Sequence, residues 1–163
     1  MLNDLGNLTT TTACAWNNLG APLSIITGRA PFELNGVLKR LQTDAPQIAF
    51  HGALIYAPRT GKKGLLGAWP LEALAMMALV RSLLASFPDL GISVFDAVHG
   101  YAVKEATGER YKLLGRKRLE VLPLQELFDA KLKEVYMISL ILPEAHLVQA
   151  VSEFLHRLHV RDI

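Results

Sequence analysis

The sequence is poor in the features that most quickly assign a protein to a class. Cys14 is the only cysteine among 163 residues, so no disulfide can form within the chain, and a reducing, cytoplasmic setting is expected. The formal net charge is only +2, which does not predict a nucleic-acid partner. The most apolar stretch, at 70–87, contains Glu72 and Arg81, so no membrane span is expected. No charged and apolar leader opens the chain, and no signal peptide is predicted.

Common catalytic signatures are missing as well. The sequence has no glycine-rich phosphate loop of the P-loop or dinucleotide-binding type, and none of its serines lies in a nucleophile-elbow pattern. The apolar fraction of 51% and the length of 163 residues suit one domain, or two small ones, with a core that needs no disulfides. Any function must therefore be inferred from shorter patterns along the chain.

The first part of the chain alternates between expected helices and strands. Threonines at the start of the stretch 9–20 favour a helix there, and Leu23–Ile26 is a short apolar run that predicts a buried strand. Pro31 and apolar residues at helical spacing predict a helix over 31–41. The stretch 47–58 predicts two strands around a turn, and 59–64 predicts a hairpin turn that returns through Leu65 and Leu66. This order indicates βαβ units and a parallel sheet.

The second part has a different pattern, typical of a small α+β unit. We expect a helix from Pro70 to Phe87, two strands joined by a short turn, a later strand and a last helix that begins at Pro143. The basic run Arg116–Arg118 is interpreted as a solvated surface inside a turn or short helix. The expected strands and the basic segment are 91–97, 100–105, 134–142 and 111–123.

The turn Thr27-Gly28-Arg29 separates the expected strand at 23–26 from the expected helix at 31–41. Backbone N–H groups at a helix N-terminus, together with a threonine hydroxyl, form a natural anion site. An ordinary βα loop that binds nothing has the same sequence features and is the commoner case. The residues alone leave both alternatives open.

The same residues carry a resemblance to a known family. IITGRAPFELNGVLKRL, 25–41, resembles the second motif of the haloacid dehalogenase (HAD) superfamily, a strand that ends in Thr-Gly-Arg before a helix. PQIAFHGALIYAP, 46–58, is similar to the next strand and its Asn-Gly-Ala turn, with His51 in place of the asparagine. The chain resembles Cof-type sugar-phosphate phosphatases in particular. The resemblance implies an α/β fold: a partial HAD-like Rossmannoid core at 1–68, followed by an α+β cap at 69–163.

The resemblance also implies roles for particular residues. Asp4 matches the catalytic nucleophile and Mg²⁺ ligand of the first motif, whereas the family's second acid, the general acid/base, is either replaced by Gly6 or deleted. Thr27, with Gly28 and Arg29, matches the phosphate-binding turn. The lysine of the third motif and the acidic pair of the fourth have no counterpart in these 163 residues. A missing general acid alone commonly lowers a rate by about 10²–10⁴-fold.

These matches imply a Mg²⁺-dependent phosphatase for small phosphorylated metabolites that is inactive or very weak as this chain. Two alternatives remain: a non-catalytic remnant that binds a phosphorylated ligand or a protein partner, and a split-gene fragment completed by a separate C-terminal polypeptide. Residues 1–8 are a candidate strand that runs into a turn. Because the strands that would flank this strand, or the strand at Leu23–Ile26, are not in the sequence, we expect an open sheet edge there. A homodimer or larger assembly through the segment 1–68 follows as an expectation.

Overall fold

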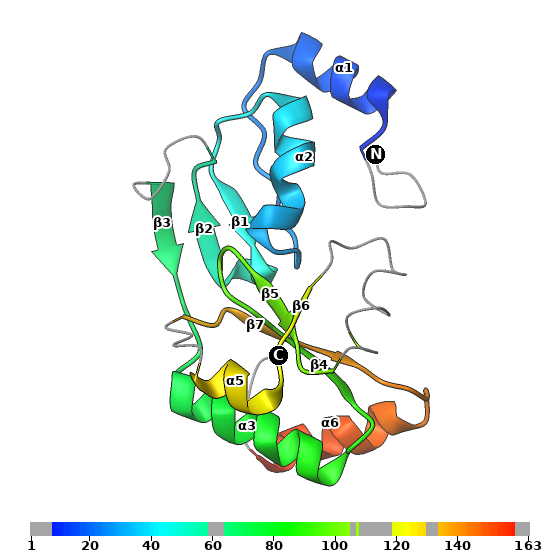
Figure 1. Cartoon of the computed structure of the whole chain (residues 1–163). Helices are drawn as coiled ribbons and strands as arrows, with labels where there is room; N and C mark the ends of the chain where they lie inside the picture. Colours follow the sequence, from blue (N-terminus) through cyan, green and yellow to red (C-terminus); the bar gives the residue numbers. More distant parts are fainter. Residues whose placement is uncertain (1–7, 59–63, 105–106, 108–118, 130–133, 159–163) are drawn as a thin grey trace.

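The structure, a computed structural model, describes residues 8–58, 64–104, 107, 119–129 and 134–158. The described residues form two connected parts, each with its own sheet (Figure 1). Among the elements whose bounds the described residues give, the N-terminal part has a three-stranded sheet and two α-helices, and the C-terminal part has a four-stranded sheet and three α-helices. The mixed α/β class is therefore confirmed. The boundary after residue 68 stays a prediction, because the two parts share a hydrophobic cluster.

The N-terminal part begins with α1 (Thr10–Leu19), which the Thr9 side chain caps and Gly20, at φ 62°, ends. After α2 (Pro31–Leu41) come β1 (Gln47–Ala49), the 3₁₀ turn Phe50–Gly52, β2 (Leu54–Tyr56) and β3 (Leu65–Ala68). The strands pair in the order β1-β2-β3, antiparallel throughout. The expected helices and the hairpin are thus confirmed, whereas the ladder of this sheet is antiparallel rather than parallel.

The prediction of a buried strand at Leu23–Ile26 is wrong. The segment joins the sheet only through one parallel bridge, between Ile26 and Ile48. Two backbone hydrogen bonds accompany the bridge, from Thr27 N to the Ile48 carbonyl at 3.0 Å and from Ile48 N to the Ile25 carbonyl at 2.9 Å. Ile26 is 74% exposed. This segment, α2 and β1 thus follow one another as in a βαβ unit, but the parallel pairing is limited to a single bridge.

A buried side chain explains why the ladder stops there. Gln47 is fully buried, and its Oε1 accepts the Ile25 N–H at 2.8 Å. Its Nε2 donates to the carbonyls of Leu23, at 2.9 Å, and Ala45, at 2.6 Å. The Thr43 hydroxyl adds a bond to each backbone group of Leu23. Because side chains satisfy these backbone groups, the segment is held in place without a strand partner.

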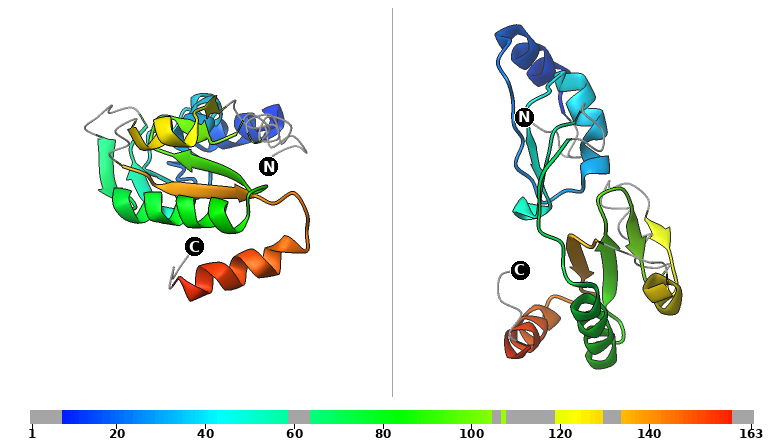
Figure 2. Two further views of the ribbon diagram at one scale, coloured as in Figure 1. Left: turned by 60° about the horizontal axis from the view of Figure 1, so that its bottom comes forward. Right: turned by 90° about the vertical axis from the view of Figure 1, so that its left-hand side faces the viewer.

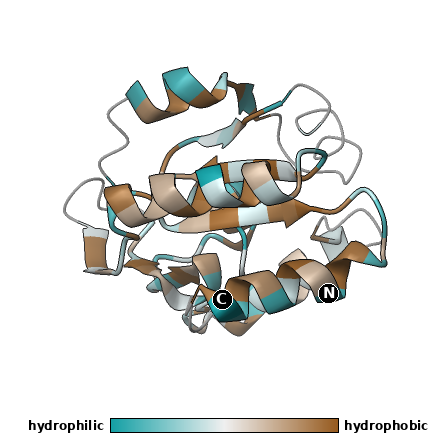
Figure 3. Ribbon diagram, turned by 90° about the horizontal axis from the view of Figure 1, so that it is seen from below, coloured by the Kyte–Doolittle hydropathy of each residue, from teal (hydrophilic) through white to brown (hydrophobic). Residues whose placement is uncertain are grey.

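The C-terminal sheet has the strand order β6-β5-β4-β7 and consists of β4 (Gly91–Phe95), β5 (Gly100–Ala102), β6 (Glu120–Val121) and β7 (Met137–Ile141). Side chains alternate between its faces, as strand geometry requires. Ile92 and Val94 pack into one cluster with α3 (Ala73–Ser86), α5 (Leu124–Asp129) and α6 (Leu147–Arg157), whereas Phe95 belongs to the other cluster. Figure 1 and the right-hand view of Figure 2 show α3 and α6 on the side of this sheet that faces away from the N-terminal part. Figure 3 looks at the molecule from that side, where the helices carry brown apolar and teal polar residues.

Several expected boundaries in this part need correction. The first helix begins at Ala73 rather than Pro70, because Glu72 is its N-cap and the backbone of Leu71 pairs with Val135. The last helix begins at Leu147, not Pro143. The expected turn or short helix over 111–123 contains β6, which pairs in parallel with β5. The basic run at 116–118 lies outside the described residues. Helix α5 was not predicted.

An aromatic cluster connects the two parts. The ring of Phe50, from the loop between β1 and β2, stacks on Tyr136 at 5.7 Å between centroids and lies 6.4 Å from Phe95. Leu54 and Ala102 belong to the same buried cluster. None of the helices in the described ranges combines the length and apolarity that crossing a lipid bilayer requires.

Candidate functional site

The turn Thr27–Arg29 lies between the extended segment and α2, as predicted. The Thr27 N–H donates to the Ile48 carbonyl, and the Arg29 N–H donates to Thr27 Oγ1 at 3.2 Å. Two of the three backbone donors of the turn are therefore used inside the protein. The Gly28 N–H donates no hydrogen bond within the described residues.

The N-terminus of α2 is also largely satisfied by the chain itself. Glu33 Oε2 accepts the Ala30 N–H at 3.1 Å, and the Glu33 N–H donates to the Ala30 carbonyl at 3.0 Å. Pro31 has no N–H to offer. The Glu33 carboxylate thus occupies the positive end of the helix dipole, where the sequence predicts free donors for an anion. Any anion site here must depend on the turn more than on the helix terminus.

A second loop closes over the turn. Phe50, His51 and Gly52 have φ values of 50°, 55° and 108°, a left-handed run that is rare for residues with a side chain. The His51 N–H donates to the Thr27 carbonyl at 3.1 Å, and the Phe50 N–H donates to the Arg29 carbonyl at 3.2 Å. We call the two segments, Thr27–Arg29 and Phe50–Gly52, the turn–loop site.

Gly28 is required at the contact between the two segments. A Cβ at this position would lie 2.1 Å from His51 Nε2 and 2.4 Å from Cε1, so no other residue fits unless the ring moves away. His51 itself is exposed to solvent. The imidazole therefore lies directly against the Gly28 backbone with one side open to water.

The turn–loop site contains three groups that can donate a hydrogen bond: a hydroxyl, an amide and an imidazole. The Thr27 hydroxyl can donate as well as accept, the Gly28 N–H has no partner among the described residues, and the His51 ring carries an N–H in either tautomer. Such a set of donors suits a single anionic oxygen as acceptor, for example one oxygen of a phosphate ester. Strained loops of this kind are commonest at functional sites.

The described part of the site does not fit Mg²⁺, which prefers carboxylate, carbonyl and water oxygens in octahedral geometry. The nearest carboxylate in sequence, Glu33, already accepts the Ala30 N–H. Asp4, which the resemblance assigns as nucleophile and metal ligand, and Gly6 lie outside the described residues. Within the described ranges, no group of three or more histidine, cysteine, aspartate or glutamate side chains gathers as a metal site would.

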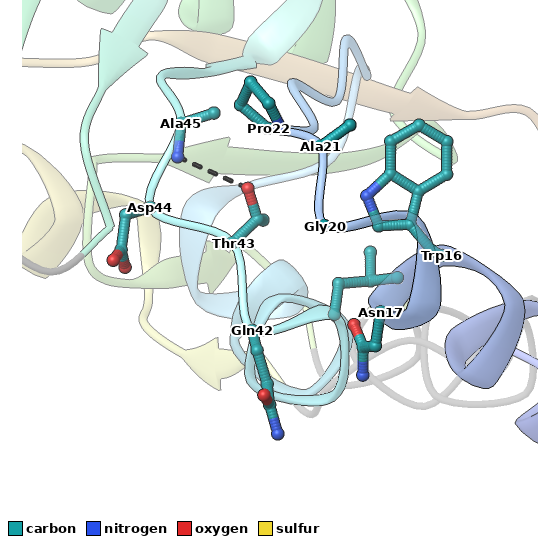
Figure 4. A pocket seen from close by; sticks show the side chains of 10 residues that line it. Trp16, Asn17, Gly20, Ala21, Pro22, Gln42, Thr43, Asp44 and Ala45 are labelled. Atoms are coloured by element: carbon teal, nitrogen blue, oxygen red, sulfur yellow. Dashed lines mark hydrogen bonds between the residues drawn. The ribbon is translucent and has the colours of Figure 1, made fainter.

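A cavity of about 350 Å³ lies elsewhere, at the C-terminal ends of α1 and α2 (Figure 4). Trp16, Pro22 and Thr43 are among its lining residues. The turn–loop site is at the opposite end of α2, which at 1.5 Å per residue is about 15 Å long. The indole N–H of Trp16 is buried and has no hydrogen-bond partner among the described residues. The cavity is thus separate from the predicted site residues.

Comparison with known protein families identifies the class. Residues 6–162 match the family model of haloacid dehalogenase-like hydrolases. Because the match covers nearly the whole chain, the chain belongs to this family, as the resemblance implied. Asp4 precedes the matched segment. A comparison with curated proteins found no match.

Solved structures of the same class share the fold. A haloacid dehalogenase-like hydrolase from Bacteroides thetaiotaomicron superposes with a TM-score of 0.77 at 13% identity, over 96% of this chain and 60% of that one. A haloacid dehalogenase-like hydrolase from B. subtilis gives 0.72 at 16% identity, over 95% and 62%. A HAD subclass IIB sugar phosphatase gives 0.64 at 15% identity, over 93% and 56%. The present chain therefore spans about three fifths of the length of these proteins.

The structure brings together three of the predicted residues and adds others. Thr27, Gly28 and Arg29 form one turn, and His51, which the sequence marks only as a replacement for asparagine, lies against it. Phe50 and Gln47 were not predicted as important. A buried glutamine inside an apolar stretch was the available signal for Gln47, whereas nothing local marks Phe50, whose partners lie 45 and 86 residues further along the chain.

Proposed function

We propose that this chain binds the phosphate group of a small phosphorylated metabolite at the turn–loop site. The observation that carries the proposal is that the turn with the Thr27 hydroxyl and the Gly28 N–H lies against the exposed His51 imidazole. Membership of a hydrolase family supports phosphate as the anion, and one structural neighbour is a sugar phosphatase. The cytoplasmic setting expected from the single cysteine agrees with such a ligand.

Binding is tested by titrating inorganic phosphate and following backbone amide shifts. Because several donors are already used inside the protein, we expect a Kd in roughly the millimolar range, about −4 kcal/mol. Shifts should concentrate at Gly28 and His51 and weaken at least severalfold in Thr27→Val, which removes only the hydroxyl. Thr11→Val, at an exposed position of α1, is the matched control. Unmoved Gly28 and His51 amides at high phosphate would refute the site.

We further propose that hydrolysis by this chain alone is absent or very weak. Gly6 in place of the second acid removes the proton donor for a leaving group, and the described part of the site holds no carboxylate set for Mg²⁺. When bound, Mg²⁺ would offset phosphate charge, and Asp4 is the residue that the resemblance assigns to hold it. The test is Mg²⁺-dependent turnover of an aryl phosphate. Turnover above buffer that vanishes in Asp4→Asn would restore an active phosphatase.

A third proposal concerns assembly. Ile26 lies at the edge of the N-terminal sheet with 74% of its surface exposed, and Leu66 of β3, at the opposite edge, is 58% exposed. Exposed edges and apolar side chains favour pairing with another chain, so we propose a homodimer formed through the segment 1–68. A separate polypeptide that completes the core is the alternative partner.

Sedimentation over a wide concentration range tests the assembly. The dimer should dissociate in Ile26→Lys or in Leu66→Lys, which also identifies the edge involved. Leu74→Lys, at a similarly exposed position on α3, should leave it intact. A monomer at every concentration would exclude self-association through either edge and leave the complementing polypeptide as the partner to seek.

A further inference from the structure

Phe50 has a backbone conformation that its residue type disfavours. Its φ of 50° lies in the left-handed region, which few bulky residues adopt because Cβ approaches the following carbonyl. His51 continues in the same region. The conformation persists only if the surroundings over-determine it. The contacts of the Phe50 side chain show what those surroundings are.

The restraint comes from the C-terminal part. The Phe50 ring is 3% exposed and stacks on Tyr136 with an interplanar angle of 5°. It also meets Phe95 at 6.4 Å and 50°. The two partners are themselves tied together, because the Tyr136 N–H donates to the Phe95 carbonyl at 2.9 Å, and the Tyr136 hydroxyl donates to Glu134 at 2.8 Å. The Phe50 ring is therefore buried against two aromatic rings of the C-terminal part that are joined to each other by a backbone hydrogen bond.

The other end of the same residue is bonded to the turn. The Phe50 N–H donates to Arg29, and the next N–H, of His51, donates to Thr27. The His51 ring then lies against Gly28, with no room for a Cβ between them. If the Phe50 ring moves, the backbone of Phe50 and His51 must move with it. That movement would disturb both hydrogen bonds to the turn and the position of the His51 imidazole.

We propose that Phe50 is a positioning residue through which Phe95 and Tyr136 of the C-terminal part hold the turn–loop site in its binding geometry. The inference rests on the proposed phosphate site for its functional meaning. The structural part of the inference does not depend on phosphate binding: the C-terminal aromatic pair determines whether the Phe50 and His51 amides stay bonded to the turn. Phe50 touches no ligand in this role.

Amide hydrogen exchange of the unliganded protein tests the structural content. Tyr136→Leu removes the stacked ring but keeps an apolar residue, so exchange of the Phe50 and His51 amides should accelerate by about three- to tenfold, the range expected for one aromatic pair. Tyr136→Phe, the matched control, keeps the ring and loses only the bond to Glu134. It should leave both amides within about twofold of the wild type.

The amide of Val80, fully buried in α3, serves as the internal reference. If Tyr136→Leu accelerates Val80 as much as His51, the variant has only lowered global stability and the positioning role is wrong. Phe50→Leu provides the same test from the other side of the contact. In this variant too, hydrogen exchange of the His51 amide must accelerate more than that of the Val80 amide. If the ratio of the two exchange rates is unchanged in both variants, the proposal is overturned.

Phosphate titration separates this proposal from the proposed function. With both correct, Tyr136→Leu weakens phosphate binding about as much as it accelerates His51 exchange, and Tyr136→Phe does not. If exchange responds as expected but the wild type binds no phosphate, the function fails and the positioning role stands. If phosphate binds the wild type and Tyr136→Leu equally, the positioning of the site through Phe50 is refuted.

Discussion

The two parts of the molecule close their cores in different ways. In the C-terminal part, β4 is buried along its whole length, and α3, α5 and α6 contribute apolar side chains to one large cluster. In the N-terminal part, the cluster that it builds from its own described residues has three buried members, Leu8, Ala13 and Leu41. Its sheet instead packs against the C-terminal part through the cluster that contains Phe50.

Buried polar groups make up part of the difference. Gln47 and Thr43 hold the extended segment before α2 with side-chain hydrogen bonds, where the C-terminal part uses backbone ladders. A small α/β segment can therefore remain ordered when one amide side chain satisfies several backbone groups and a neighbouring part supplies apolar cover. A consequence of this arrangement is that two large apolar side chains of the N-terminal part, Ile26 and Leu66, remain exposed to water.

Truncating one leucine in each part gives the largest expected contrast. Leu83→Ala, in the closed cluster of the C-terminal part, should lower the free energy of unfolding by about 3–5 kcal/mol, since the surroundings cannot fill the void. Leu41→Ala should cost about 2 kcal/mol, because Leu41 lines the water-accessible cavity and its removal makes no dry void. Urea unfolding measures both, and equal losses would contradict the comparison.

Removing the Gln47 amide tests the polar restraint of the N-terminal part. Gln47→Ala should lower the free energy of unfolding by about 2–4 kcal/mol, because it leaves the Ile25 N–H and the Leu23 carbonyl without this partner. Gln149→Ala, on the surface of α6, should change it by less than about 0.5 kcal/mol. In a Trp69→Phe background, Trp16 fluorescence reports the N-terminal part. An unchanged midpoint in Gln47→Ala would show that the segment needs no such restraint.

Alkaline pH acts on a tyrosine in each part. Burial raises the pKa of Tyr56 to about 12, and burial followed by Glu134 raises the pKa of Tyr136 to about 12. Above pH 10 the unfolded chain loses these protons first, so the free energy of unfolding falls as pH rises from 10 towards 12. Below pH 10 the effect is absent.

Tyr56→Phe sharpens that measurement. The buried Tyr56 hydroxyl has no hydrogen-bond partner in the part of the chain that the structure describes, so at pH 7 the variant should be as stable as the wild type, or more stable by about 0.5–1 kcal/mol. It should also remove one of the two alkaline losses, while Tyr136→Phe removes the other. A pH profile of Tyr56→Phe that coincides with the wild-type profile would contradict the assignment.

The smallest expected effect is a gain. Gly36 lies inside α2, and a Cβ added there would meet nothing within 4 Å, so Gly36→Ala should stabilise the N-terminal part by about 0.5–1 kcal/mol. Gly28→Ala is the opposite case, since its Cβ would meet the His51 ring. Thermal unfolding followed by Trp16 fluorescence distinguishes them. A loss of stability in Gly36→Ala would mean that α2 is strained at this point.

Local patterns in the sequence determined most of the elements. Apolar spacing predicted α2, α3 and α6 within a few residues at their starts, and the hairpin of β2 and β3 followed from its glycine-rich turn. The Thr27-Gly28-Arg29 turn and the family were recognisable for the same reason, because they are short motifs. Periodicity and turn chemistry act over a few residues, so a single sequence carries them.

Tertiary structure alone decided how those elements are used. That Leu23–Ile26 is not a strand follows from the Gln47 amide, and that Glu33 occupies the helix terminus follows from the way the chain enters α2. The left-handed conformation of Phe50 depends on Tyr136, 86 residues away. Such outcomes depend on contacts between distant residues and on which partner satisfies each buried polar group, and neither is encoded in a local pattern.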